Sequence, residues 1–162
     1  MKRSLFRFIS DVPVLIVVLV LLQACGSRKP RPPQDAPGAP PDLIIESLSI
    51  TNQGSYHVGQ TVAVVNVTKN CSNAVTKNFF NLFYLCTSSN AIAGSCYWTN
   101  HPVNVGAGWF GVTTKSYTNQ FRLPTVASGN WHLCAVADGS NNVVEAQEIN
   151  NTNAIVITIL NP

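Results

Sequence analysis

The chain has 162 residues, enough for one domain with appendages, and 46% of them are hydrophobic. Its formal net charge of +3 is misleading, because six of the ten Lys and Arg residues precede position 32. From Asp42 onward, four basic and five acidic residues leave a net charge of −1. This part of the chain lacks the clustered positive charge that nucleic-acid binding requires, so we expect no nucleic-acid partner.

Residues 1–24 have the layout of a secretory signal peptide. Basic residues in Met1–Asp11 precede an apolar run over Val12–Leu22, and small residues follow at Ala24 and Gly26. The apolar run is about half as long as the roughly 20 residues that a membrane-spanning helix needs. The pattern therefore predicts export and cleavage, and an uncleaved membrane anchor is the weaker alternative.

The segment Leu22-Gln23-Ala24-Cys25 resembles the bacterial lipobox. The resemblance implies that the Cys25 thiol takes a diacylglyceryl group and that cleavage before Cys25 frees its amine for a further acyl chain, such as palmitate. Each buried CH₂ contributes about 0.8 kcal/mol, so two or three chains anchor a protein firmly to a lipid bilayer. The alternative is a chance cysteine near an ordinary cleavage site. Gly26 after the cysteine is compatible with sorting to the outer membrane.

Residues 25–41 form a predicted tether. Ser27–Pro41 contains six prolines and no bulky apolar side chain. Such a segment cannot bury enough surface to fold, and its prolines favour an extended conformation of about 3.1 Å per residue. We expect a spacer between the bilayer and the domain, with a proline-rich ligand for a partner as the alternative.

Residues 42–162 show hydrophobic alternation with a period of two, which indicates β-strands. Leu43–Ile50 is a first strand in which Glu46 falls in register with Ile44 and Leu48, so we expect a bulge or a sheet edge there. Phe79–Cys86 is apolar on both faces, as in a central strand.

Other strands alternate more regularly. Thr61–Lys69 has Ala63, Val65 and Val67 on one face, opposite Val64, Asn66 and Thr68. Further shared faces are Tyr117, Phe121 and Leu123; Trp131, Leu133, Ala135 and Ala137; and Ile155, Ile157 and Ile159. Gly, Pro, Asn and Asp separate these runs, and no helical periodicity appears after the signal peptide. The pattern predicts an all-β, immunoglobulin-like antiparallel β-sandwich of about seven strands.

Several segments carry a resemblance to a known family: Pro41–Ile45, Gly59–Val62, Val67–Asn70, Trp131–Asp138, Asn142–Glu145 and Glu148–Asn151. Together they resemble the CARDB domain, a cell-adhesion-related bacterial module, over about residues 41–160. The resemblance implies a seven-stranded immunoglobulin-like sandwich that serves adhesion or surface scaffolding. Cys71, where a turn glycine is commoner, and the enlarged segment Ser89–His101 depart from the family pattern.

The acidic segment near the end of the chain has two interpretations. Asp138-Gly139-Ser140-Asn141-Asn142 is typical of a turn, and Glu145–Asn151 of a polar connection between the last two strands. The alternative is a calcium site, because four side chains offer hard oxygen ligands: Asp138, Asn142, Glu145 and Glu148. Their spacing differs from that of an EF-hand, and a structural turn is favoured over a metal.

Four cysteines remain once Cys25 is lipidated, and an even number in an exported domain indicates disulfides. We prefer Cys86–Cys96, which closes a short loop after the central strand, together with Cys71–Cys134. The alternation places Cys134 out of phase with Trp131 and Leu133, which argues against a bridge through the core. A zinc site is a weak alternative, since no C-x₂-C spacing occurs.

Histidines and aromatic residues are the remaining candidates for function. His57, His101 and His132 lack any recognisable catalytic motif around them, so we expect no enzyme, and a small hydrolase is a remote alternative. Four aromatic residues near loops form either a binding patch or a cap on the core: Tyr97, Trp98, Trp109 and Phe110.

These patterns predict a lipid-anchored, non-catalytic adhesion or recognition domain at the cell envelope, at the outer membrane or cell surface. We expect no cofactor, and the partners are the bilayer, through acylated Cys25, and a protein or glycan ligand. The alternative function is a periplasm-facing assembly or docking factor for an envelope complex.

Overall fold

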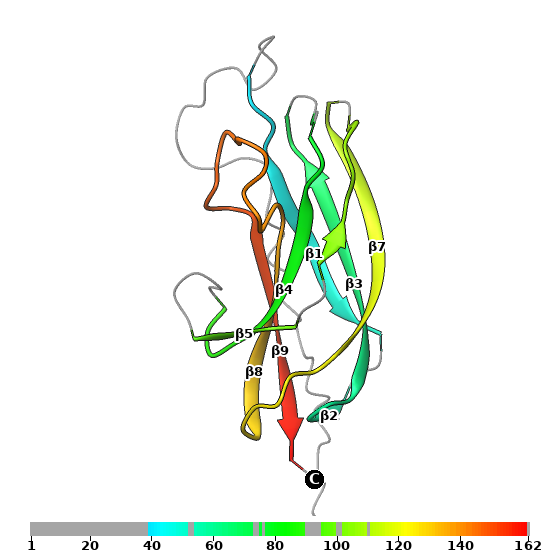
Figure 1. Ribbon diagram of the computed structural model, residues 1–162, viewed down its shortest axis with the longest axis vertical. Coiled ribbons are helices and arrows are strands. Elements are labelled where there is room, and N and C mark those ends of the chain that lie inside the picture. The colour runs from blue at the N-terminus through cyan, green and yellow to red at the C-terminus, as the bar shows by residue number, and fades with distance from the viewer. Residues whose placement is uncertain are drawn as a thin grey trace, which may run out of the picture.

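The computed structural model describes residues 39–51, 54–72, 75, 77–89, 95–99, 102–109 and 111–161. These residues form two β-sheets packed face to face (Figure 1). No helix in this part of the chain is long and apolar enough to cross a membrane. The predicted signal peptide, Cys25 and nearly all of the tether lie outside the described residues.

The smaller sheet has three antiparallel strands in the order β1-β3-β7, and the larger has six, five of them in the order β2-β9-β8-β4-β5. β6 pairs with β4, and β2 runs parallel to β9. The predicted all-β sandwich is confirmed. The strands are β1 (Leu43–Ile50), β2 (Ser55–His57), β3 (Thr61–Asn70), β4 (Phe80–Cys86), β5 (Cys96–Trp98), β6 (Val103–Asn104), β7 (Thr113–Arg122), β8 (Gly129–Val136) and β9 (Thr152–Leu160).

β1 contains the predicted irregularity at Glu46. Its register with β3 shifts between Ile45 and Ser47, so that Ile45 and Leu48 both face the core. The carbonyl oxygen of Ile45 accepts a hydrogen bond of 3.1 Å from the Asn153 side chain, and Lys69 Nζ lies 2.8 Å from Glu46 Oε1. The bulge therefore keeps a charged side chain at the surface of an otherwise buried strand.

The apolar core lies between the two sheets. β4 contributes Phe83 and Leu85, β8 contributes Leu133 and Ala135, and all four are fully buried. The ring centroids of Phe83 and Phe121 lie 5.5 Å apart across the interface. The predicted central position of β4 is confirmed, because β8 flanks it on one side and β5 and β6 on the other.

The buried face of β3 changes from apolar to polar along the strand. Val62 and Val64 are buried near its start, whereas Asn66, Thr68 and Asn70 are fully buried toward its end. Ala63, Val65 and Val67 form the opposite, half-buried face. The alternation is as predicted, but the face turned to the core is the more polar one.

Hydrogen bonds within the interior make this burial possible. Thr68 Oγ1 accepts hydrogen bonds from Asn66 Nδ2 at 3.0 Å and from Asn81 Nδ2, on the opposite sheet, at 2.7 Å. Asn119 Nδ2 donates to Asn66 Oδ1 at 3.0 Å. A buried polar group without a partner costs about 1–3 kcal/mol, so one hydroxyl links the two sheets by satisfying two amides.

We expect Thr68→Val, which keeps the shape of the side chain, to lower the free energy of unfolding by about 1–3 kcal/mol, because two buried amide groups lose their acceptor. Urea denaturation followed by fluorescence measures the change. The matched control is Thr61→Val, at an exposed position on the same strand, which should shift the free energy by less than about 0.5 kcal/mol. Equal effects of the two substitutions would show that the network contributes little.

Candidate functional site

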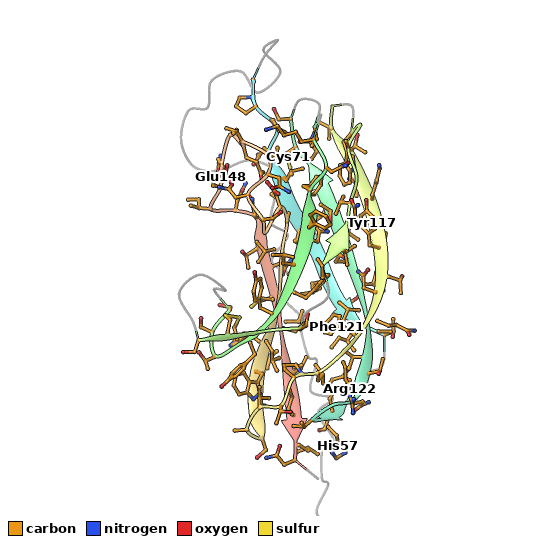
Figure 2. All side chains as sticks on the ribbon, in the orientation of Figure 1. His57, Cys71, Tyr117, Phe121, Arg122 and Glu148 are labelled. Atoms are coloured by element: carbon orange, nitrogen blue, oxygen red, sulfur yellow. A yellow bond between two sulfur atoms is a disulfide. The ribbon has the colours of Figure 1, made fainter. Side chains whose placement is uncertain are left out.

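The connection between β8 and β9 brings the predicted acidic residues together at the end of the sandwich where the described chain begins (Figures 1 and 2). Asp138 is buried and adopts a left-handed backbone conformation, with φ of 44°. Its carboxylate accepts hydrogen bonds from the backbone N–H groups of Asn142 at 3.0 Å and Val143 at 2.7 Å. This is the turn that the Asx-rich sequence predicted.

Glu145 fastens the connection to the start of β1. Its carboxylate accepts a hydrogen bond of 2.5 Å from the Leu43 backbone N–H and one of 2.8 Å from Asn151 Nδ2. Beside it, Asn150 Nδ2 donates to Asp42 Oδ1 at 2.9 Å, and the Ala146 N–H donates to the Pro41 carbonyl oxygen at 2.8 Å. The point where the predicted tether enters the domain is thus held by several hydrogen bonds. We call residues 138–151 the polar connection.

Burial makes two carboxyl groups of the polar connection, those of Asp138 and Glu145, weaker acids. Desolvation raises the pKa of Glu145 to about 8, and the charges of Glu148 and Asp138 act in the same direction. Desolvation also raises the pKa of Asp138, although its two backbone hydrogen bonds oppose the shift. The hydrogen bonds from the Leu43 N–H and the Asn151 side chain oppose the rise in the pKa of Glu145, and the folded protein binds a proton at Glu145 more tightly than the unfolded chain does.

The calcium alternative finds little support here. Among the described residues, no group of three or more His, Cys, Asp or Glu side chains is arranged to hold a metal ion. Both carboxylate oxygens of Asp138 and of Glu145 already accept protein N–H groups, and Glu148 Oε1 accepts the Glu145 N–H at 3.0 Å. The side chain of Asn142 is exposed. The carboxylates of Asp138 and Glu145 serve the turn and the connection.

The cysteines follow one of the two preferred pairings. Cys86 and Cys96 lie opposite each other on β4 and β5 and form a disulfide, as expected. The pairing Cys71–Cys134 is wrong, because Cys134 is a free, buried thiol. Cys134 alternates with the core residues of β8, so its side chain lies on the outer face of the larger sheet.

The aromatic residues do not form one patch. Trp109 belongs to the core, packed edge-on against Phe79 with ring centroids 5.6 Å apart, and Lys115 Nζ lies 4.7 Å from its ring centroid. Tyr97 on β5 is 47% exposed and packs against Trp131 of β8 at a centroid distance of 5.6 Å. Binding through Trp109 is therefore excluded. The side chain of Trp98 and all of Phe110 lie outside the described residues.

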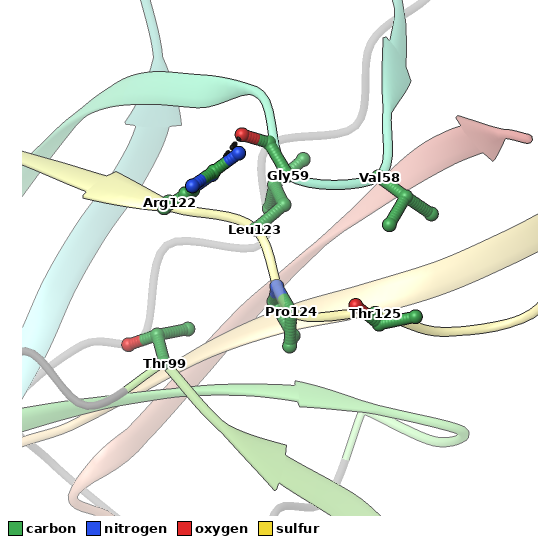
Figure 3. Close-up of a pocket in the computed structure, with 7 residues that line it drawn as sticks. All are labelled: Val58, Gly59, Thr99, Arg122, Leu123, Pro124 and Thr125. Atoms are coloured by element: carbon green, nitrogen blue, oxygen red, sulfur yellow. Dashed lines mark hydrogen bonds between the residues drawn. The ribbon is translucent and has the colours of Figure 1, made fainter. Parts of the chain in front are cut away.

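A pocket of about 490 Å³ lies at the end of the sandwich away from the polar connection (Figures 2 and 3). Arg122 and Leu123 at the end of β7 form one side of it, and the β2–β3 turn forms another. Arg122 Nε donates to the Gly59 carbonyl oxygen at 2.6 Å, which fixes the guanidinium over the turn. We call it the distal pocket. Its lining residues are Val58, Gly59, Thr99, Arg122, Leu123, Pro124 and Thr125.

Trp131 and Arg122 were not among the sequence candidates. Alternation with Leu133 predicts a core position for Trp131, but at the start of β8 its side chain is only half-buried. Arg122 occurs in a polar edge strand without a motif around it. In the sequence, the signal for a site at this end of the molecule is the charged residue Arg122, which stands just before the turn that contains Pro124.

The described histidines provide no catalytic constellation. His57 is exposed on β2 and His132 is half-buried on β8. In the described part of the chain neither imidazole has a hydrogen-bond or ion-pair partner, whereas hydrolytic catalysis requires a base that is oriented by a neighbour. His101 lies outside the described residues.

Known proteins offer a likeness of fold. No family model matches the chain, and a search of curated proteins finds no match. The crystal structure of the CARDB domain of the PF1109 protein from Pyrococcus furiosus, in complex with di-metal ions, is 20% identical over 76% of this chain and 96% of that chain, with a TM-score of 0.47. The solution structure of the same domain gives 21% identity, coverage of 75% and 97%, and a TM-score of 0.45.

A third similar structure is the C-terminal domain of wzt, with 10% identity, coverage of 80% of this chain and 82% of that chain, and a TM-score of 0.41. At such identities the likeness concerns how the strands are arranged and says nothing of what this chain binds.

Glu145 should make the stability of the domain depend on pH. Its pKa is higher in the folded than in the unfolded chain, so the folded state holds the extra proton, and the free energy of unfolding falls as pH rises from about 4.5 to about 8. We expect Glu145→Gln to reduce this fall by about 2–4 kcal/mol, because the amide carries no charge to bury. Urea denaturation at a series of pH values measures it. The same fall in both proteins over this pH range would contradict the prediction.

Cys134 should resist alkylation in the folded protein. Burial raises the pKa of its thiol to about 11, and Sγ lies 3.7 Å from the Ser88 carbonyl oxygen and 3.9 Å from that of Ser89. The thiolate is the reactive form, so we expect iodoacetamide at about pH 8 to modify Cys134 at least ~100-fold more slowly in folded than in urea-unfolded protein. Mass spectrometry of the peptide that contains Cys134 gives both rates. Rapid labelling of the folded protein would contradict the burial of this thiol.

Proposed function

We propose that the chain is a bacterial lipoprotein that presents a non-catalytic adhesion or recognition domain at the cell envelope. The signal-peptide layout and the lipobox-like segment ending in Cys25 support the anchor, and the proline-rich tether supports a domain held away from the bilayer. The resemblance of about residues 41–160 to a cell-adhesion-related module supports binding rather than catalysis.

The observation that carries this proposal is the arrangement of the two ends of the sandwich. The tether enters at Pro41, beside the polar connection, whereas the distal pocket with Arg122 lies at the opposite end (Figures 1 and 2). β5 and the start of β8, which carry Tyr97 and Trp131, lie in the same half as the distal pocket (Figure 1). A domain anchored at one end would therefore present these groups away from the membrane.

The distal half offers the chemistry of a recognition surface. Tyr and Trp provide large contact areas with few rotatable bonds, and Arg provides several N–H donors in a fixed plane. Arg122 uses Nε for the turn, and its side chain is exposed. Carboxylate-bearing proteins or acidic glycans are ligands that such a surface would suit. A periplasm-facing docking factor would use the same surface toward an envelope complex.

Protease added to intact cells of the host bacterium tests the proposal. The tether should be cut first, because proline-rich segments without a core are accessible to proteases with suitable specificity, whereas the sandwich is protected. We expect release of a fragment of about residues 42–162 from intact cells. Protection until the outer membrane is opened would contradict surface display and favour the periplasmic docking function.

The anchor needs a separate measurement. Mass spectrometry of the mature amino-terminal peptide should show Cys25 carrying acyl chains, and Cys25→Ser should release the domain from the membrane fraction. The matched control is Cys134→Ser, which leaves the lipobox intact and should stay membrane-bound. A Cys25 thiol held in a disulfide, without lipid, would refute the anchor, because one sulfur cannot carry both.

A further inference from the structure

A second pocket lies against the polar connection, far from the distal pocket. It has a volume of about 360 Å³ and opens on the outer face of the larger sheet. Tyr84 of β4 and Val136 of β8 alternate with core residues and form its apolar side, while Asp138, Glu148 and Asn151 form its polar side. We call it the acidic pocket. It combines an apolar wall with oxygen atoms at one end.

The carboxyl groups around the acidic pocket repel one another and lack a cation. The charge of Glu148 raises the pKa of both Asp138 and Glu145, and the charge of Asp138 raises that of Glu145. Within the described ranges, none of these three residues forms an ion pair. The ion pair between Lys69 and Glu46 lies elsewhere, on the smaller sheet.

Asn151 supplies an independent indication of a ligand. Its side chain is 5% exposed, it lines the acidic pocket, and its Nδ2 donates to Glu145 Oε1. Its Oδ1 is buried and has no hydrogen-bond partner in the described part of the chain. A buried acceptor without a donor costs about 1–3 kcal/mol, so a donor that entered the pocket would remove this cost.

We propose that the acidic pocket binds a basic side chain, through a guanidinium or ammonium group carried on an apolar stem. The cationic head pairs with the exposed carboxylate of Glu148, close to the charge of the buried Asp138, and donates to Asn151 Oδ1, and the stem lies along Tyr84 and Val136. A planar guanidinium suits the oxygen acceptors of the acidic pocket, because it has five N–H donors and tolerates partial burial. The volume exceeds what a bare ion fills, and no metal-holding group of His, Cys, Asp or Glu is found among the described residues.

Two sources can supply this chemistry. One is another protein; the other is the tether itself, where Arg28, Lys29 and Arg31 precede the domain. From Arg31 to Pro41 an extended chain covers about 30 Å, which is enough to reach the polar connection. The site goes beyond the recognition function proposed for the distal half, and it stands whether or not Cys25 is lipidated.

The test uses the mature chain, residues 25–162, with Cys25→Ser so that it stays soluble. Its ¹⁵N-labelled form is titrated with N-acetyl-arginine methylamide at low ionic strength, and amide shifts are followed by NMR. We expect saturable shifts at residues 138–152 and on β4 around Tyr84. The matched probe is N-acetyl-citrulline methylamide, which has the same shape without the charge and should bind at least about tenfold more weakly.

Glu148→Gln tests how much the negative charge of Glu148 contributes to binding of the arginine probe. Glutamine can still accept the Glu145 N–H, and residue 148 is exposed, so we expect an unchanged fold and affinity for the arginine probe reduced about fivefold or more. Glu46→Gln is the control and should bind normally. Equal binding of the two probes, equal binding by Glu148→Gln, or shifts with Ca²⁺ but none with the arginine probe would each overturn the proposal.

A second variant distinguishes the sources. It replaces the three basic residues of the tether by glutamine: Arg28→Gln, Lys29→Gln and Arg31→Gln. Tighter binding of the arginine probe by this variant would identify the tether as an occupant of the acidic pocket. Unchanged binding would assign the pocket to a basic side chain of another protein.

Discussion

The sandwich depends on how its first strand is held at the point where the chain enters it. β1 is an edge strand of the smaller sheet, and the backbone N–H of Leu43 has its partner in a side chain about a hundred positions later, Glu145. The same connection satisfies Pro41 and Asp42. Closing so long a loop costs conformational entropy, which the burial of the two sheets offsets. The polar connection thus joins the start of the domain to its last part.

Polar groups inside the protein have two roles. The interior network around Thr68 joins the sheets through its hydrogen bonds, although Asn81 Oδ1 has no partner among the described residues, and it favours one alignment of the sheets over others. In the acidic pocket, by contrast, repelling carboxyl groups and the unpartnered Asn151 Oδ1 remain. Satisfied polar groups specify a structure, whereas unsatisfied ones near a surface indicate where a ligand would be stabilised.

Much of the fold could be predicted because β-sandwiches obey a period of two. The strand positions, the bulge at Glu46 and the disulfide Cys86–Cys96 follow from local alternation and short loops. Which face of β3 is buried could not be predicted. The face with Ala63, Val65 and Val67 is turned outward, and the face that bears Asn66 and Asn70 is turned inward. Only hydrogen-bond partners on other strands make the burial of these amides possible. Cys134 was paired wrongly because counting cysteines outweighed the alternation of β8, which already pointed its side chain away from the core.

The sites were harder to predict than the fold, for a physical reason. Trp109 and Tyr97 stand in similar loop-rich sequence, yet one meets Phe79 in the core and the other meets Trp131 at the surface. Which of these occurs depends on tertiary neighbours that sequence spacing does not encode. The acidic residues were recognised as a cluster, but the missing partner of Asn151 is visible only when every donor and acceptor has a position.

The antiparallel pairing of β1 with β3 gives the domain a mechanical property. Ladder hydrogen bonds lie across the strands, and β1 runs from the tether end toward the distal end (Figure 1). If the domain is held at Pro41 and pulled through a ligand at the far end, the force acts along β1 and loads the whole ladder in shear at once. Under a force in this direction, the hydrogen bonds between β1 and β3 share the load instead of breaking one after another. The sandwich can therefore bear tension along its length.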